Sequence, residues 1–337
     1  MKFLGKLLFL MLTLFFVGSS PLFANTGNIT GAGSTFIYPL MSLWAKNYSK
    51  IKGENINYQP IGSGGGLRQI YADTIDFAAS DMPLSTKELD ERGLIQFPVA
   101  CGGIVPIINV KGINSNELVL NGNVLSNIYM GNITFWDDAQ IQKLNPDLKL
   151  PHSKIILIVR ADGSGTTYNF TNYLAKANKE WNERVGYDVV VKWPSSIIGS
   201  KGNAGVAAQV KIIPNSIGYV EYAYIKESKG LIPVKMINKD NQQVTASATS
   251  FYSAASSADW TESNGFYSVI TDAEGKESWP IAASTFVLIP KKKMQTSSGK
   301  IVVEFFIWAL KYGQEDASSL DYIPMPKNVV SLIILKL

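Results

Sequence analysis

A strand gives way to a helix in the stretch IVRADGSGTT, residues 158–167. The β-branched residues just before Arg160 are typical of a strand, and the apolar spacing that follows predicts a helix over residues 166–179. The Gly-Ser-Gly turn between them leaves the first N–H groups of the helix without backbone partners, and such groups attract anions. Taken alone, these ten residues fit an ordinary helix start with a surface Arg–Asp pair equally well.

The same succession of strand, glycine-rich turn and helix occurs elsewhere in the chain. It is found over residues 29–52, where Pro39 lies in the expected first helical turn, and over residues 55–70, where Gly62–Gly66 are expected to form a loop ahead of a helix that starts at Leu67. A further glycine loop at residues 199–203 precedes a helix. Alternating strands and helices predict an α/β protein. The glycines lack the Lys-Ser/Thr ending of a nucleotide-binding loop, so a nucleotide site is weakly supported.

Asp81 follows the strand expected over residues 74–80. Open α/β sheets bind ligands at the carboxyl ends of their strands, so Asp81 is a candidate site residue. It could equally be a solvated turn residue. The helix after it should start at Ser85 and Glu88, which match a capping box, and should end near Gly93.

Two long apolar segments, residues 97–109 and 279–289, predict two crossings between lobes. We expect a discontinuous first lobe, residues 25–98 plus 282–337, and a second lobe, residues 99–281, with the ligand in the cleft between them. Residues 189–194 are expected to form another strand, and residues 298–312 a helix with one apolar face. The apolar tail after Val329 is too short to span a membrane and is expected to dock as a helix.

Residues 1–24 have the pattern of a secretory signal peptide, with two lysines, an apolar core and small residues before the expected cleavage site. We therefore expect a soluble, exported protein of a Gram-negative periplasm. The formal charge of +4 falls to +2 without Lys2 and Lys6 of this leader, which is too balanced for a nucleic-acid binder.

The chain has one cysteine and one histidine, which limits its chemistry. Cys101 cannot form an intramolecular disulfide and is most simply a small buried apolar residue. His152 follows a proline in a loop-like segment. A single histidine makes a His-based metal cluster or a Ser-His-Asp triad improbable.

Several motifs, taken in order, resemble the family of periplasmic phosphate-binding proteins that serve high-affinity phosphate ABC importers. They are GAGSTF (31–36), IGSGGG (61–66), ASDMPLS (79–85), RADGSGT (160–166), KGN (201–203) and IGYVEYA (217–223). The resemblance covers essentially the whole chain after the leader. It implies the two-lobed type II binding-protein fold, with two hinge strands joining the lobes. Pro39 departs from the family pattern at the start of the first helix.

The resemblance also implies which residues hold the ligand. From the first lobe they would be Thr35, Phe36 through its backbone, Ser63 and Asp81, and from the second lobe Arg160, Ser164, Gly165 through its backbone and Thr166. Asp162 would orient Arg160. A binding protein of this kind is not an enzyme, needs no cofactor or metal, is monomeric and delivers phosphate to the membrane permease subunits of the importer. The place of Lys201, in the cleft or beside it, stays open.

The chemistry of these side chains suits a tetrahedral oxyanion. Hydroxyl and N–H donors can replace the water of the ion, and one arginine adds charge. A carboxylate at Asp81 could accept the proton that phosphate retains, whereas sulfate has none to give, so we expect sulfate to be rejected by roughly 10⁴-fold or more. A receptor for another oxyanion, such as sulfate or molybdate, is one alternative. An exported phosphatase is another, although no histidine or metal cluster is placed to activate the hydroxyls.

Overall fold

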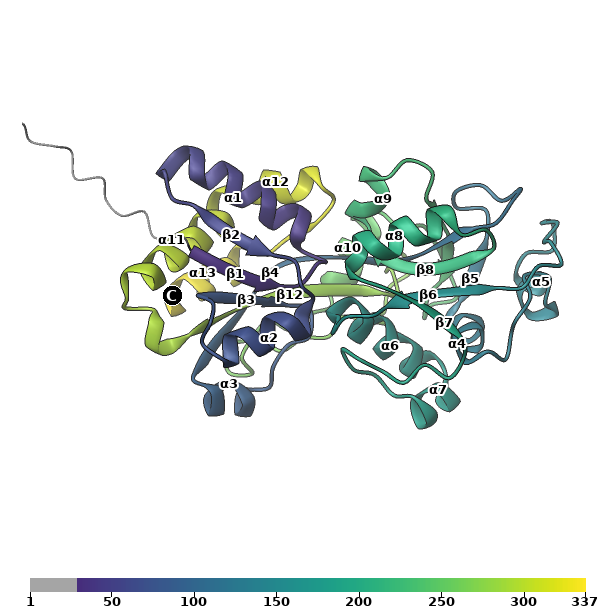
Figure 1. Ribbon diagram of the computed structural model, residues 1–337, viewed down its shortest axis with the longest axis horizontal. Helices are drawn as coiled ribbons and strands as arrows, with labels where there is room; N and C mark the ends of the chain where they lie inside the picture. The colour runs from purple at the N-terminus through teal and green to yellow at the C-terminus, as the bar shows by residue number, and fades with distance from the viewer. Residues whose placement is uncertain (1–28) are drawn as a thin grey trace, which may run out of the picture.

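The protein folds into two α/β lobes that lie side by side, as the computed structural model shows for residues 29–337 (Figure 1). The signal peptide predicted at residues 1–24 lies outside the described residues. The strands are β1 (Ile29–Gly33), β2 (Ile56–Gln59), β3 (Phe77–Ser80), β4 (Leu94–Asn109), β5 (Val119–Asn121), β6 (Ile156–Arg160), β7 (Ile197–Ser200), β8 (Ser216–Glu221), β9 (Ile232–Pro233), β10 (Lys235–Ile237), β11 (Gln243–Val244), β12 (Ala282–Pro290) and β13 (Ile323–Pro324).

Helices cover the strands on both sides. They are α1 (Tyr38–Lys52), α2 (Ser63–Tyr71), α3 (Thr86–Arg92), α4 (Gly122–Met130), α5 (Ala139–Leu144), α6 (Gly165–Ala177), α7 (Lys179–Arg184), α8 (Gly202–Ile212), α9 (Ala223–Glu227), α10 (Ala248–Ala255), α11 (Ser297–Tyr312), α12 (Gln314–Ser319) and α13 (Lys327–Lys336), with a 3₁₀ turn at Lys291–Lys293. In residues 29–337, no helix is long and apolar enough to cross a membrane.

One sheet runs through both lobes, in the order β2-β1-β3-β12-β4-β8-β6-β7. The outer strands pair in parallel, β1 with β2 and β3 and β6 with β7 and β8, whereas β4 is antiparallel to both β12 and β8. Strand β4 pairs with β12 up to Gly103 and with β8 from Ile104 onward, so it changes partner where the lobes meet. The exact lobe boundaries stay a prediction.

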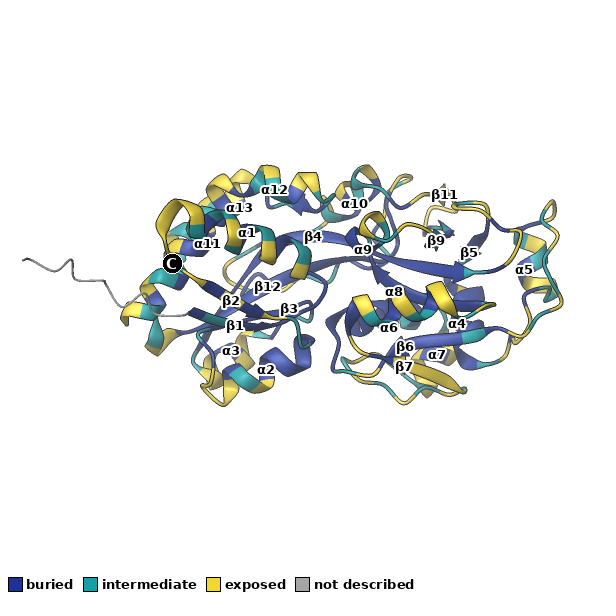
Figure 2. Cartoon of the chain, turned by 45° about the horizontal axis from the view of Figure 1, so that its top comes forward, coloured by how far each residue is buried: buried dark blue, intermediate teal, exposed yellow. Residues whose placement is uncertain are grey.

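Each lobe has its own aromatic core, which packs against the strands of that lobe. In the first lobe the ring of Phe77 packs at right angles to that of Phe306 from α11, with centroids 5.0 Å apart. In the second lobe Phe170 of α6 stacks on Tyr219 of β8 at 4.0 Å. Figure 2 shows the result, with buried strands in the middle and exposed residues on the outer helix faces. Rings that interlock in this way resist bending, so the lobes can hold the loops between them in fixed positions.

Several local predictions are confirmed. The capping box is present, with the Ser85 hydroxyl accepting from the N–H of Glu88 and the Glu88 carboxylate accepting in return. Helix α11 has the predicted apolar face, and the C-terminal tail docks as α13 through the buried side chains of Val329 and Ile333. Cys101 is buried and free, and His152 lies exposed in a loop, stacked on Phe135.

The strand predicted at residues 189–194 was wrong. The segment is irregular, Val190 is 66% exposed, and the free edge of β6 is taken instead by β7. A run of β-branched residues forms a strand only where a neighbouring strand can pair with it, and here the carbonyl of Val189 accepts from the N–H of Ser164 instead.

The glycine loop expected before Leu67 was also wrong, because Gly64–Gly66 already lie in the first turn of α2. Close packing explains these glycines better than loop flexibility does. A Cβ on Gly66 would stand 2.6 Å from the carbonyl oxygen of Ala32, and one on Gly64 would stand 3.1 Å from Cα of Gly163. The helix can therefore start directly against β1 and against the second lobe.

Candidate functional site

Four helix starts meet between the lobes, those of α1 and α2 from the first lobe and α6 and α8 from the second. The N–H of Gly64 in α2 donates to the carbonyl of Gly163 across the interface, at 2.9 Å. The side chain of Asn203 in α8 reaches Thr35, three residues before α1, at 2.8 Å. The first N–H groups of a helix have no partners within the helix, and its N-terminus is the positive end of the helix dipole, so a place where four helix starts meet suits an anion.

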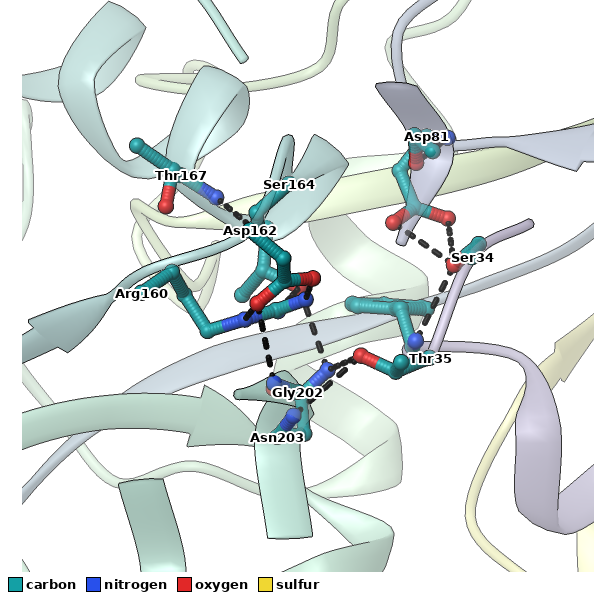
Figure 3. A network of polar contacts seen from close by, with 12 residues as sticks. Ser34, Thr35, Asp81, Arg160, Asp162, Ser164, Thr167, Gly202 and Asn203 are labelled. Carbon is teal, nitrogen blue, oxygen red and sulfur yellow. Dashed lines mark hydrogen bonds and ion pairs between the residues drawn. The ribbon is translucent and has the colours of Figure 1, made fainter. Parts of the chain in front are cut away.

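Asp81 is the buried carboxyl group of this site, with 1% of its surface exposed. The hydroxyl of Ser34 donates to it at 2.6 Å (Figure 3). The hydroxyl of Thr285 donates to the same oxygen at 2.7 Å. Burial raises the pKa of Asp81 to about 6, although these hydroxyls and the charge of Arg160 pull it down. The carboxyl group is therefore ionised at neutral pH and protonated in mild acid.

Arg160 lies at the end of β6 and forms a fork with Asp162. Its Nε donates to Oδ1 of Asp162 at 2.9 Å, and its Nη2 makes a shorter contact with Oδ2. The same Oδ1 accepts from the N–H of Gly202. Burial alone would raise the pKa of Asp162, but the hydrogen bond and charge of Arg160 outweigh it, so the net pKa lies below the usual value. A carboxylate held in this way fixes the guanidinium plane.

Nη1 of Arg160 points the other way and donates to Oγ1 of Thr166 at 3.2 Å. Thr166 and its neighbour Ser164 belong to the start of α6, where the Ser164 hydroxyl accepts from the N–H of Thr167 as the N-cap. The start of α6 thus brings two hydroxyl groups close to the guanidinium group of Arg160. It also brings there the first N–H groups of the helix, including that of Gly165, which have no partners within the helix.

The first-lobe residues lie opposite. The Ser63 hydroxyl accepts from the N–H of Asp81 at 3.1 Å. The N–H of Phe36 donates to the Ser34 hydroxyl at 3.0 Å, so a ligand at this backbone group would share or replace that bond. The carbonyl of Thr35 accepts from the hydroxyl of Tyr224 in the second lobe at 2.7 Å. Direct bonds of this kind between the lobes mark a closed arrangement.

The structure brings all nine predicted site residues to this one place. They are Thr35, Phe36, Ser63, Asp81, Arg160, Asp162, Ser164, Gly165 and Thr166. Which of them touch a ligand stays a prediction. Lys201 is exposed and lies beside the site, where it lines a cavity of about 710 Å³ together with Tyr38, Tyr224 and Thr35.

Sequence reasoning missed four residues of the network: Ser34, Asn169, Asn203 and Thr285. Ser34 and Asn203 stood inside quoted motifs, so their positions were flagged but their roles were not. Thr285 lies in a buried strand, and Asn169 of α6 donates to the carbonyl of Asp81 at 2.7 Å. No local signal separates these two from ordinary buried polar residues, because their partners are distant in the chain.

Comparison with known proteins agrees with this architecture. The model of the PBP superfamily domain matches residues 20–307. The chain is 48% identical over 305 residues to phosphate-binding protein PstS of Xylella fastidiosa, covering 90% of this chain and 83% of the relative. It is 46% identical over 317 residues to phosphate-binding protein PstS of Haemophilus influenzae, covering 94% of each.

A solved structure has the same fold at much lower sequence identity. The phosphate-binding protein of Stenotrophomonas maltophilia superposes with a TM-score of 0.67 at 17% identity, covering 91% of this chain and 93% of that one. Both lobes are therefore shared, together with the way in which they are joined. The chain belongs to the PBP superfamily and, within it, to the family of phosphate-binding proteins PstS.

Proposed function

We propose that this protein is an exported receptor that binds inorganic phosphate between its lobes and passes it, without turnover, to the permease subunits of an ABC importer. The observation that carries this proposal is the buried site itself, with one arginine held by Asp162, several hydroxyl groups and the buried carboxyl group of Asp81 between two lobes. The names of the PstS relatives support the same ligand.

Of the nine residues brought together in the site, we propose that all except Asp162 contact phosphate. Thr35, Ser63, Ser164 and Thr166 would donate through hydroxyl groups, and Phe36 and Gly165 would donate through the backbone. Arg160 would supply positive charge, and Asp162 would hold it in place. Many moderate donors can replace the hydration shell of the ion without preventing its release.

Asp81 would give the site its selectivity. Its carboxylate would accept the proton of phosphate, whereas with sulfate it would face an oxygen lone pair with no proton between them. Because the group is buried, water cannot relieve that conflict. We expect discrimination of roughly 10⁴-fold or more.

The setting of the receptor follows from the family and the leader. The signal peptide predicted at residues 1–24 would direct export, and the receptor would act in the periplasm as a monomer. Closure of the lobes would bury the ion and present one shape to the permease. Tight scavenging requires a micromolar or better dissociation constant, which is roughly 8 kcal/mol of binding free energy or more.

Equilibrium titration with labelled phosphate, in competition with excess sulfate, tests this function. The wild-type protein should bind phosphate at micromolar concentration or below and should ignore sulfate. In Asp81→Asn the preference for phosphate over sulfate should fall by at least about 100-fold. Asp90→Asn is the control, since Asp90 is exposed and pairs with the exposed Lys291, away from the site. Equal competition by sulfate in the wild type would rule out the proposed selectivity.

A further inference from the structure

Asn203 is buried at the centre of the site, although the ligand set described above does not include it. It is the second residue of α8 and has no exposed surface. Its side chain contacts Thr35 of the first lobe (Figure 3). It also contacts both Thr166 and Glu221 of the second lobe. A fully buried amide with three partners is fixed in one orientation, so the direction of each of its hydrogen bonds can be worked out.

The backbone of Glu221 sets that orientation. Its N–H, which can only donate, lies 3.0 Å from Oδ1 of Asn203, so the oxygen of the amide must face Glu221. The nitrogen Nδ2 therefore faces the two threonine hydroxyls, at 2.8 Å from Oγ1 of Thr35 and 3.2 Å from Oγ1 of Thr166. An amide nitrogen donates and does not accept, so both hydroxyls must act as acceptors toward Asn203.

Each threonine hydroxyl receives a second protein donor. Oγ1 of Thr35 also accepts from the backbone N–H of Asn203 at 3.2 Å, and Oγ1 of Thr166 also accepts from Nη1 of Arg160 at 3.2 Å. A hydroxyl has two acceptor sites and one proton. Two donors therefore occupy both acceptor sites of each hydroxyl, which can then form a further hydrogen bond only by donating its proton. Over residues 29–337 no protein group accepts either proton.

We propose that Asn203 is a positioning residue that turns the hydroxyls of Thr35 and Thr166 into obligatory hydrogen-bond donors toward the bound anion when the lobes close. The inference rests on the proposed phosphate-binding function. Thr35 and Asn203 belong to different lobes, so the Thr35 hydroxyl is oriented only in the closed form, whereas the contacts that orient Thr166 lie within the second lobe. Closure therefore does more than exclude water, because it also adds the Thr35 hydroxyl as a second oriented donor beside Thr166.

Asn169 provides a matched control. It too is a buried asparagine that bonds across the lobes, from its Nδ2 to the carbonyl of Asp81 at 2.7 Å, and it also donates to the carbonyl of Gly165. Both of its acceptors are carbonyl groups, so it orients no hydroxyl. Loss of Asn169 should weaken closure alone, whereas loss of Asn203 should weaken closure and also release the two hydroxyl protons.

The experiment compares phosphate affinity in wild type, Asn203→Leu, Asn203→Asp and Asn169→Leu by calorimetric titration at pH 7.5 and at pH 5, each value being expressed relative to wild type at the same pH. Circular dichroism and thermal unfolding establish that each variant is folded. At pH 7.5 both substitutions of Asn203 should lower the affinity by at least about 30-fold, and Asn203→Asp should lower it most, since a carboxylate would accept the hydroxyl protons and repel the anion.

The decisive result is at pH 5. A protonated carboxyl group matches an amide, because its carbonyl can accept from Glu221 while its O–H donates to a threonine. Asn203→Asp should therefore regain at least about tenfold relative affinity on acidification, while Asn203→Leu and Asn169→Leu should regain none. If Asn203→Asp and Asn203→Leu bind equally at pH 5, or if Asn203→Leu binds as wild type does, the proposal is wrong. Failure of the wild type itself to bind phosphate would instead refute the proposed function.

Discussion

Gly165 of the second lobe lies directly against Asp81 of the first. A Cβ placed on Gly165 would stand 2.7 Å from both Cβ and Oδ2 of Asp81, which is closer than such atoms approach in folded proteins. Gly165 opens helix α6, and Asp81 follows β3, so the contact joins the anion-binding helix start of one lobe to the buried carboxyl group of the other. The lobes can therefore close fully only if residue 165 lacks a side chain.

Gly165→Ala should consequently hinder closure while leaving each lobe folded. We expect phosphate affinity to fall by at least about 100-fold, because the added methyl group must displace Asp81 or hold the lobes apart. Titration calorimetry measures the loss, and small-angle scattering with saturating phosphate should show a larger radius of gyration than in wild type.

Gly205→Ala is the control for that substitution. Gly205 lies inside α8, where the nearest neighbour of an added Cβ would be at an ordinary 3.5 Å. This variant should bind phosphate normally and gain up to about 1 kcal/mol of stability, since alanine favours the helix. Unchanged affinity in Gly165→Ala would show that the closed contact with Asp81 is not required for binding.

Selectivity should depend on pH through Asp81. Burial is the largest influence on its pKa and raises it to about 6, so the carboxyl group is an acceptor above that pH and can donate its proton below it. A donor suits sulfate, whose oxygens carry no proton. Direct binding of labelled sulfate should therefore strengthen from pH 7.5 to pH 5, by up to about tenfold per pH unit above 6, and should level off below 6, where the carboxyl group is already protonated. In Asp81→Asn, which does not titrate, the same measurement should give a nearly flat profile.

Arg160→Lys should weaken binding although it preserves the charge. A lysine ammonium cannot donate in the plane of the Asp162 carboxylate and reach Thr166 at the same time, as the guanidinium does. We expect phosphate affinity to fall by at least about tenfold. Arg184→Lys, in an exposed pair with Glu180, is the corresponding control and should change nothing. Equal affinity in both variants would mean that Arg160 contributes charge alone.

Glu221→Gln should stabilise the protein, and more so as the pH rises. Burial raises the pKa of Glu221 well above 4.5, although hydrogen bonds from Tyr322 and from the N–H of Ala223 oppose it. The folded state then binds more protons than the unfolded state between these two pKa values. The free energy of unfolding of the wild type must therefore fall with rising pH in that window, by up to about 1.4 kcal/mol per pH unit.

A glutamine at position 221 lacks this titration but can keep both hydrogen bonds. The difference in melting temperature between Glu221→Gln and wild type should grow from pH 4.5 to pH 7.5, as measured by thermal unfolding at several pH values. Glu91→Gln, in an exposed pair with Lys87, should show no such trend. A constant difference across this range would mean that Glu221 is ionised in the folded protein throughout.

Much of the fold could be predicted because its signals are local. The alternation of strands and glycine-led helices indicated an α/β protein, the capping box at Ser85 located α3, and the apolar periodicity located α11. Prediction failed at residues 189–194, where β-branched residues lacked a strand to pair with. Such pairing depends on which edge of β6 is free, and neighbouring residues in the chain carry no information about that.

The sequence by itself determined the chemical inventory of this protein. It supplied one arginine beside a helix start, hydroxyl groups in glycine-rich turns and one carboxyl group after a strand, and these indicated an oxyanion. Tertiary structure alone decided how those groups act. Contacts between residues more than a hundred positions apart bury Asp81 under Thr285 and set Asn203 against Thr35. A pKa or the direction of a hydroxyl proton depends on burial and on spatial neighbours, and here the folding of each lobe and the closure of the two lobes create them.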